Sequence, residues 1–549
     1  MTSMTLPTRR KALKLFAGVP LLPLGASGAA AFLAGCGGGS DDEQAQFAAA
    51  AFTSMAAPTL ANPSAMATTS VGSALKVTMS DQSVRSFDLA YQPFFITGDA
   101  VPDGKGGTML AGGYYDIRNQ PIVDRTVPAS PRQFFSDSPD GTSLLTVPGA
   151  KVEGVKGNPV FAVVQFEYTS LAQDGISDMY GRLPSPIAVL TLDQNPDTGK
   201  LSLVKYHNVD TSSAHGLWIT CGASLSPWGT HLSSEEYEPD AFTAASSSQF
   251  KAFSQNLFGS ETAANPYHYG HLPEVTVKAD GTASIQKHYC LGRISHELVQ
   301  VMPDERTTLM GDDATNGGLF VFIADKARDL SAGTLYVAKV GAGFSVDPAG
   351  PAATLTWIQL GSATSAQIEA LAGSTAPSDI FDLASKDPSD ASFRKTISNG
   401  RTEWLRLKPG MEKAAAFLET HRYAAYVGAS MGFSKMEGTT VNVRDKVAYS
   451  ALQNVQDSMV KGGKGHTDGN GIALDKALKA GAVMALNLRG GQKDLAGAVI
   501  HSDWMPADTR ALITGEDISA DALGNTANPN RIANPDNLKF SEKLRTLFI

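Results

Sequence analysis

The stretch Val160-Phe-Ala-Val-Val-Gln-Phe-Glu-Tyr168 is rich in β-branched and aromatic residues, and this composition predicts a buried β-strand. Comparable apolar runs occupy residues 187–192, 318–323 and 334–338, and turn sequences such as Asn195-Pro-Asp-Thr-Gly199 separate them. Many short strands at this spacing are typical of a sandwich, a barrel or a propeller. In a chain of this length, the repeated hairpins favour an all-β fold, a β-propeller with helical insertions.

The composition narrows the class of protein. The chain has 549 residues, of which 42% are hydrophobic and 18% charged, so it can bury a core without disulfides. Its 45 basic and 54 acidic residues give a net charge of −9, which argues against nucleic-acid binding because that needs a basic face. Three cysteines in so long a chain exclude a disulfide scaffold.

The N-terminus has the pattern of an export signal covering residues 1–35. Arg9 and Arg10 precede a mildly apolar run that ends in small residues before Cys36. The adjacent arginines predict twin-arginine export, and Leu-Ala-Gly-Cys predicts a lipoprotein cleavage box with lipidation of Cys36. A transmembrane anchor is the alternative, but the prolines and glycines make this run poor helix material. We therefore expect a periplasmic or lipid-anchored protein that touches the membrane only through its signal or lipid.

Twin-arginine export carries folded proteins, and it is used when a cofactor must be loaded before the membrane is crossed. Removal of the signal lowers the basic residues from 45 to 41, leaves the 54 acidic residues, and changes the net charge to −13. Cys221 and Cys290 then remain beside Cys36, and they are able either to pair or to hold a metal.

The rest of the chain divides by composition. Residues 36–75 are rich in Gly, Ala, Ser and Thr and predict a flexible tether. Residues 76–549 are expected to form one propeller domain, with helical excursions at about 365–423 and 462–491. The second excursion is expected to contain a helix from Ala473 to Leu488.

The last residues of the sequence are Arg545-Thr-Leu-Phe-Ile549, an apolar run typical of a strand. Either this strand closes the sheet or the sequence is truncated. Because globular chains seldom end inside a core strand, we expect truncation and an incomplete propeller.

One loop carries the most informative polar residues. Cys221 lies in a glycine-containing loop, Pro227-Trp-Gly229 forms a turn, and a short strand then leads to Glu235 and Glu236. A lone cysteine is most often a small buried hydrophobe, and the turn has an ordinary packing role. The functional interpretation is that the fold brings the soft Cys221 thiolate and a hard glutamate carboxylate to the opening of one site.

Three further loops place an acidic residue beside a Gly or Pro turn at the end of a strand. They are Asp312-Asp313, Lys435-Met-Glu-Gly438 and Pro535-Asp-Asn-Leu538. Each alone is typical of an ordinary turn acid. A propeller brings the loops of distant blades to one central channel, so their joint occurrence predicts a common site.

These segments resemble the PhoX family, exported calcium- and iron-dependent alkaline phosphatases with a β-propeller fold. The resemblance runs from about residue 212 to residue 549, and more weakly back to about residue 90. It is carried, in order, by Cys221-Gly-Ala-Ser with Pro227-Trp-Gly-Thr230 and Glu235-Glu236, by Gly292-Arg-Ile-Ser-His-Glu297, by Asp312-Asp313, by Lys435-Met-Glu-Gly438 and by Pro535-Asp-Asn-Leu538. The twin-arginine signal fits the family as well.

The resemblance implies a compact cluster of ferric iron and calcium in the propeller channel. It implies Cys221 as the thiolate ligand to iron and Glu437 and Asp536 as carboxylate ligands. Asp312 stands in the place of a family glutamate, with Asp313 beside it, and Glu236 is a further candidate. Ferric iron accepts thiolate and carboxylate, whereas calcium takes many oxygen ligands. The metals would neutralise and orient a phosphate ester and supply its nucleophile.

The sequence also departs from the family pattern. Lys435, the expected phosphate-binding catalytic residue, stands where the family has Arg, so the bidentate fork is lost. Asp312 is shorter than the family glutamate by one methylene. Gly222-Ala-Ser224 replaces the usual Ala-Gly-Gly, and the sequence stops where the family continues into another acidic turn. These differences indicate a divergent subgroup.

The leading hypothesis is a monomeric, metal-dependent phosphatase that hydrolyses small-molecule phosphate monoesters at an iron and calcium cluster. A phosphodiesterase on the same metals is a neighbouring possibility. The alternative from another class is a non-catalytic, calcium-binding propeller lipoprotein that binds a surface partner. A lactonase-like propeller with calcium alone is disfavoured because it gives Cys221 no role.

Overall fold

The computed structural model describes residues 45–56 and 61–549. The expected signal with Arg9 and Arg10 and the expected lipidation site Cys36 lie outside the described residues. The chain divides into two compact units, of which the first contains residues 1–94, 197–199 and 541–546 and the second contains the remainder. In the described ranges, no helix is both long and apolar enough to cross a membrane.

The first unit contains an antiparallel sheet of three strands, β1 (Phe47–Phe52), β2 (Ser70–Met79) and β3 (Val84–Ala90). The composition of residues 36–75 predicted a flexible tether, but β1 and the first half of β2 lie within this segment. The segment forms strands because the side chains of β2 alternate between the two faces of the sheet. The apolar ones lie on one face, where they form a small core with Phe47. Small residues such as those of β1 carry little strand signal until a partner strand pairs with them.

The second unit is built from four antiparallel meanders of four strands each, as in the blades of a propeller. The meanders contain β8 (Pro139–Leu145), β9 (Asn158–Phe166), β10 (Ile187–Gln194) and β11 (Leu201–Asn208); β12 (Ser224–Leu225), β13 (His231–Leu232), β14 (Leu272–Val277) and β15 (Ala283–His288); β16 (His296–Val301), β17 (Thr307–Gly317), β18 (Phe320–Lys326) and β19 (Asp329–Val340); and β24 (Phe433–Asn442), β25 (Val447–Leu452), β26 (Ala482–Arg489) and β27 (Met505–Thr514). The all-β, propeller-like fold predicted from the short strand runs is confirmed.

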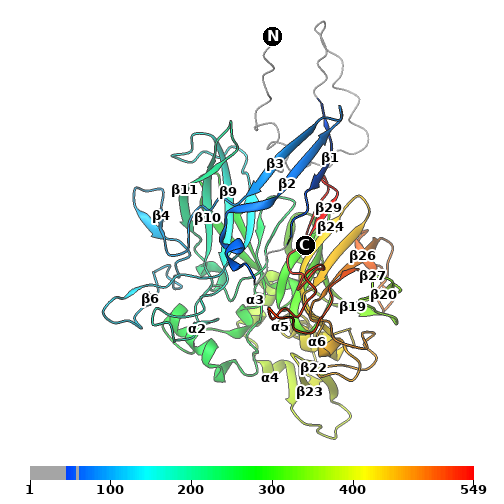
Figure 1. Ribbon diagram of the computed structural model, residues 1–549. Helices are drawn as coiled ribbons and strands as arrows, with labels where there is room; N and C mark the ends of the chain where they lie inside the picture. Colours follow the sequence, from blue (N-terminus) through cyan, green and yellow to red (C-terminus); the bar gives the residue numbers. More distant parts are fainter. Residues whose placement is uncertain (1–44, 57–60) are drawn as a thin grey trace, which may run out of the picture. The chain divides into compact units, whose positions relative to one another are not determined.

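The third and fourth meanders are not separate blades. Strand β20 (Ala353–Thr364) pairs with both β19 and β27, which joins the two meanders into one nine-stranded sheet. The sheet closes on itself because β17 also pairs with β24, with Asp312 opposite Met436. Figure 1 shows β19, β20, β26 and β27 side by side along this sheet. This closure places Asp312-Asp313 next to Lys435-Met-Glu-Gly438, two acidic segments that are far apart in the sequence.

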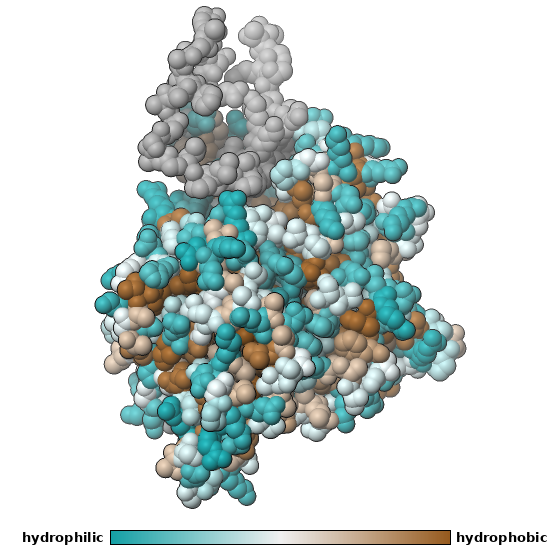
Figure 2. Space-filling view, turned by 180° about the vertical axis from the view of Figure 1, so that it is seen from behind, coloured by the Kyte–Doolittle hydropathy of each residue, from teal (hydrophilic) through white to brown (hydrophobic). Residues whose placement is uncertain are grey.

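Both faces of this sheet are buried, which explains its continuous apolar strands. On β18, Phe320 and Phe322 pack against the helices, whereas Val321 and Ile323 face a second core with Trp357. The exposed apolar side chains on the face drawn in Figure 2 lie in small groups among polar ones.

Helices occupy the first expected excursion, at its two ends. The described α-helices are α2 (Ser248–Phe258), α3 (Ser365–Ala372), α4 (Pro377–Ile380), α5 (Glu412–Leu418) and α6 (Thr420–Tyr426). A three-stranded sheet lies between α4 and α5, formed by β21 (Phe381–Ala384), β22 (Arg394–Ser398) and β23 (Arg401–Leu407).

The prediction of a helix from Ala473 to Leu488 is wrong. The segment is a loop followed by β26, whose residues pair on one side with β25 and on the other with β27. Its Ala and Leu residues favour a helix locally, but two partner strands satisfy the backbone and bury both faces.

The remaining elements are short. The short strands are β4 (Ala100–Pro102), β5 (Thr108–Leu110), β6 (Val123–Asp124), β7 (Arg132–Gln133), β28 (Lys539–Ser541) and β29 (Thr546–Phe548), and the 3-10 helices are η1 (Pro63–Ala67), η2 (Ser212–Ala214), η3 (Ala244–Ser246), η4 (Pro266–His268), η5 (Tyr289–Leu291) and η6 (Asp457–Met459).

Candidate metal centre

One thiol and six carboxyl groups from all four meanders lie close together, and we call this set the acidic cluster. Its members are Asp140 of β8, Glu167 after β9, Cys221 before β12, Glu236 after β13, Glu297 of β16, Asp313 of β17 and Glu437 of β24. Strand ends and loops of different meanders therefore meet at one site, as a propeller-like arrangement requires.

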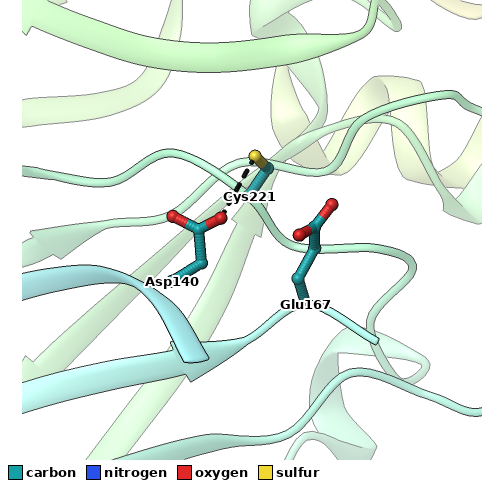
Figure 3. A group of neighbouring side chains, drawn as sticks. All are labelled: Asp140, Glu167 and Cys221. Carbon is teal, nitrogen blue, oxygen red and sulfur yellow. Dashed lines mark hydrogen bonds between the residues drawn. The ribbon is translucent and has the colours of Figure 1, made fainter. Parts of the chain in front are cut away.

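The acidic cluster is a row of three overlapping groups. In each group the possible ligand atoms lie within 4.8 Å of one another: Asp140 with Glu167 and Cys221, Cys221 with Glu236 and Glu297, and Glu297 with Asp313 and Glu437. Figure 3 shows the first group, in which the Asp140 and Glu167 carboxyl groups and the Cys221 thiol come together from three segments. Because Cys221 and Glu297 each belong to two groups, the row has room for more than one ion.

In each of two adjacent acidic pairs, only one residue joins the cluster. Glu236 belongs to it, whereas Glu235 is buried on the other side, where the Lys287 Nζ donates to it at 2.9 Å. Asp313 likewise belongs to it, whereas both Asp312 oxygens lie 2.9 Å from the His421 Nε2. The structure therefore places the predicted ligand Asp312 in a buried ion pair outside the three groups.

Asp536, another predicted ligand, lies beside Glu437 but outside the three groups. Its backbone carbonyl accepts a hydrogen bond from the Gly438 N–H at 3.1 Å. Asp536 is exposed as a residue, and its carboxylate accepts a hydrogen bond from the Gln453 Nε2 at 2.8 Å. A Cβ at position 438 would come within 2.5 Å of the Asp536 carbonyl oxygen, so this glycine allows the two loops to approach.

Lys435 places a positive charge against the cluster. Its Nζ lies 2.5 Å from the Asp313 Oδ2, 2.6 Å from the Tyr237 Oη and 3.4 Å from the Glu437 Oε1. Burial opposes the charged form, but Asp313 and Glu437 outweigh it and raise the pKa of Lys435 above its ordinary value. The Tyr237 hydroxyl also donates to Asp313.

Backbone strain accompanies this contact. Lys435 and Tyr237 have φ angles of +52° and +47°, a region that side-chain-bearing residues rarely adopt. The register of β24 also shifts between Met436 and Thr439. Such conformations cluster at functional sites, where surrounding structure holds them in place.

Burial and mutual repulsion oppose the ionisation of three glutamates and the thiol of the cluster. Burial, followed by neighbouring negative charges, raises the pKa of Glu297 to about 8 and that of Glu437 to about 10. The same causes raise the pKa of Glu167 to about 7 and that of the Cys221 thiol well above its usual range. Cations bound among these groups would reverse the shifts, because an ion favours the deprotonated form of each ligand.

The residues present fit metal ions on their own chemistry. Among the described residues, the Glu297 Oε1 and the Asp313 Oδ1 are buried without a hydrogen-bond partner, and the buried Glu437 Oε1 makes no hydrogen bond beyond its 3.4 Å ion pair with Lys435. Unpartnered buried oxygens are costly unless an ion or water satisfies them. Carboxylate oxygens suit calcium, and a thiolate among carboxylates suits a transition metal such as iron.

The sequence predictions reached Cys221, Glu236, Asp313 and Glu437 but missed three members of the acidic cluster. Glu297 stood at the end of a quoted motif without being chosen. Asp140 has the same signal as the chosen loops, since it stands between Pro139 and Gly141 at the start of a strand. Glu167 offered no such signal, because it ends an apolar run.

Comparison with known proteins identifies a family and agrees with the fold. The sequence model of the family described as alkaline phosphatase PhoX matches residues 194–545. Among solved structures, the chain is similar to Pseudomonas fluorescens PhoX in complex with vanadate, a transition state analogue, at 18% sequence identity and a TM-score of 0.50. This similarity covers 82% of this chain and 78% of the other. A comparison with curated proteins finds no match.

Proposed function

Because this chain belongs to the alkaline phosphatase PhoX family, it is a phosphoric ester hydrolase, and we propose that it hydrolyses phosphate monoesters at a cluster of calcium and ferric iron. The observation that carries the proposal is the acidic cluster: three overlapping groups of possible ligands that include one thiol. Uncompensated carboxylates at this density need cations to be ionised together.

Two kinds of ion fit two parts of the row. Cys221 would hold iron together with Glu236 or Glu297, and the carboxylates Glu297, Asp313 and Glu437 would hold calcium. When bound, such ions supply Lewis acidity and neutralise the charge of the ester and its nucleophile.

The protein's own groups bind and orient the ester. The Lys435 Nζ lies at the partly exposed edge of the cluster, where it can donate to a phosphate oxygen. The Tyr237 hydroxyl, 2.6 Å from that nitrogen, positions the lysine between Asp313 and the substrate. The ring of Tyr237 also lies 5.3 Å from the Lys435 Nζ, which restricts its movement.

The proposed setting is the periplasm, or the cell envelope through a lipid on Cys36, after export by the twin-arginine route. Arg9 and Arg10 support this part of the proposal. The partner is a small-molecule phosphate ester, and the proposed state is a monomer.

The test uses the full-length protein loaded with calcium and iron. Release of 4-nitrophenol from 4-nitrophenyl phosphate is expected to be abolished by a chelator and restored by the two metals. Elemental analysis is expected to find iron in the wild type and not in a folded Cys221→Ser variant, with Cys290→Ser as the matched control. A metal-loaded protein without chelator-sensitive turnover would overturn the proposal, and a folded Cys221→Ser protein that retains iron would overturn the ligand assignment.

A further inference from the structure

A cavity of about 590 Å³ is lined by residues of β17 and of the loops near Lys435, and none of the site residues above lines it. Its basic side chains are Arg401, Lys464 and Lys479, and its one acidic side chain is Asp457. Arg401 pairs with Asp240 at 2.6 Å, whereas the ammonium groups of the two lysines form no ion pair with an acidic side chain among the described residues. The cavity, which we call the basic cavity, therefore has a net positive lining in an acidic protein.

Three connections place the basic cavity next to the acidic cluster. Thr315, which lines it, follows Asp313 by two residues on β17. Asn454, which also lines it, follows Gln453, the donor to the Asp536 carboxylate. Residues two apart in the chain lie within about 7 Å of each other. One strand, β17, therefore contributes Asp313 to the cluster and, two residues further on, Thr315 to the cavity lining.

A third connection links the backbone of Lys479 to the loop that carries Asp536, which lies beside the cluster member Glu437. The Asn534 side chain donates to the Lys479 carbonyl at 2.9 Å and to the Gln453 carbonyl at 3.2 Å. Asn534 precedes the predicted ligand Asp536 by two residues. The position of Lys479 is therefore fixed relative to the edge of the acidic cluster.

Buried hydrogen bonds hold the other two basic loops in place. Asn316 is almost fully buried at the end of β17, and its Nδ2 donates to the Gly465 carbonyl at 2.7 Å. Its Oδ1 accepts from the Gly400 N–H at 3.0 Å. One side chain thus clamps the loops that carry Lys464 and Arg401 onto the strand that carries Asp313.

We propose that the basic cavity binds the alcohol portion of the phosphate ester and selects esters whose alcohol carries a second negative charge, such as a carboxylate or another phosphate. This inference rests on the proposed phosphatase function. The phosphate to be cleaved lies at the acidic cluster beside Lys435, and the second anion pairs with Lys464 and Lys479. The volume suits a sugar-sized group, and neutral Asn, Gln and Ser side chains in the lining supply hydrogen bonds to hydroxyls.

The test compares two esters of similar size, glucose 6-phosphate and 6-phosphogluconate, of which the second has a carboxylate on its alcohol portion. Phosphate release by the metal-loaded full-length protein is expected to show a higher kcat/KM for 6-phosphogluconate. The double variant Lys464→Ala with Lys479→Ala is expected to lower the ratio of the two kcat/KM values about tenfold, mainly through KM. High salt is expected to lower the same ratio in the wild type. Lys476→Ala, an exposed lysine of the same loop outside the cavity lining, is the matched control and should change nothing.

The outcomes separate this inference from the function on which it rests. Turnover of both esters with a ratio that is unchanged in the double variant overturns the cavity assignment and leaves the phosphatase function intact. The phosphatase function fails only if 4-nitrophenyl phosphate is not turned over either. If neither sugar ester is turned over, the two esters serve as ligands in calorimetric titrations of the wild type and the double variant. Binding of 6-phosphogluconate that depends on the two lysines would uphold the cavity assignment, and equal binding by both proteins would overturn it.

Discussion

Lys435 combines charge, strain and contact in one residue. Its φ of +52° accompanies a side chain that contacts Asp313 and Glu437, and the Asp313 carboxylate raises the pKa of the lysine against the effect of burial. A lysine offers a phosphate oxygen a point charge, whereas an arginine offers a planar fork. The single residue therefore sets how firmly the phosphate of the substrate is held.

We predict that Lys435→Ala lowers kcat/KM for 4-nitrophenyl phosphate by roughly 10- to 100-fold, because the loss removes a charge-assisted hydrogen bond at a partly buried site. Lys435→Arg is expected to retain most of the activity, since it keeps the charge. Steady-state kinetics of the metal-loaded variants measures both effects. Lys413→Ala, an exposed lysine on α5, is the control, and an alanine variant as active as this control would contradict the role of Lys435.

At the scale of elements, short strands depend on buried polar contacts for their position. Strands β12 and β13 have two residues each, too few to hold their place by pairing alone. Glu274 of β14 accepts hydrogen bonds from the Trp228 Nε1 at 2.8 Å and from the Thr230 Oγ1 at 2.5 Å, and it lies 2.7 Å from the His288 Nε2. These contacts fix the turn that follows Cys221.

The stabilisation by Glu274 should depend on pH. Burial opposes its ionisation, but the bonds from His288, Thr230 and Trp228 prevail and lower its pKa to about 2. A carboxyl group with a lowered folded-state pKa stabilises the fold above its unfolded value of about 4.5, and this contribution is lost as the pH falls toward 2. We predict that Glu274→Gln lowers the free energy of unfolding by about 3 kcal/mol at neutral pH and by much less near pH 2.

Chemical denaturation of the metal-free protein at several pH values measures this difference. Glu412→Gln, an exposed residue at the start of α5, serves as the control. An equal loss of stability at neutral and at acid pH would show that the charge of Glu274 is not the cause.

At the scale of the whole molecule, the acidic cluster joins all four meanders, so metal ions there would tie the second unit together. Without ions the folded state retains protons on Glu297 and Glu437, whose pKa values are about 8 and 10. The unfolded chain releases these protons above pH 4.5 or so. The folded state therefore binds more protons than the unfolded state across this range, and stability falls as the pH rises.

We predict that the melting temperature of the chelator-treated protein falls steadily between pH 5 and pH 8, while that of the calcium- and iron-loaded protein stays nearly level. Scanning calorimetry of both forms in the same buffers measures the difference. The metal ions deprotonate their ligands in the folded state, so the linkage to pH is reversed or removed. A metal-free protein whose melting temperature is independent of pH would contradict this explanation.

The sequence by itself determined the fold class and part of the site. Continuous apolar runs are local signals of buried strands. Cys221, Asp313 and Glu437 stand next to glycine or within two residues of it, and Glu236 follows the Pro227-Trp-Gly229 turn. Only the tertiary structure decided that Asp313 and not Asp312 enters the cluster, because the pairing of β17 with β24 sets the face of each side chain. The tertiary structure also added Asp140, Glu167 and Glu297 to the cluster and showed that Asp312 pairs with His421 instead. It has strand β26 where a helix was expected within Ala473 to Leu488. These outcomes depend on strands and side chains that are far apart in the sequence, so the residues next to each position cannot predict them.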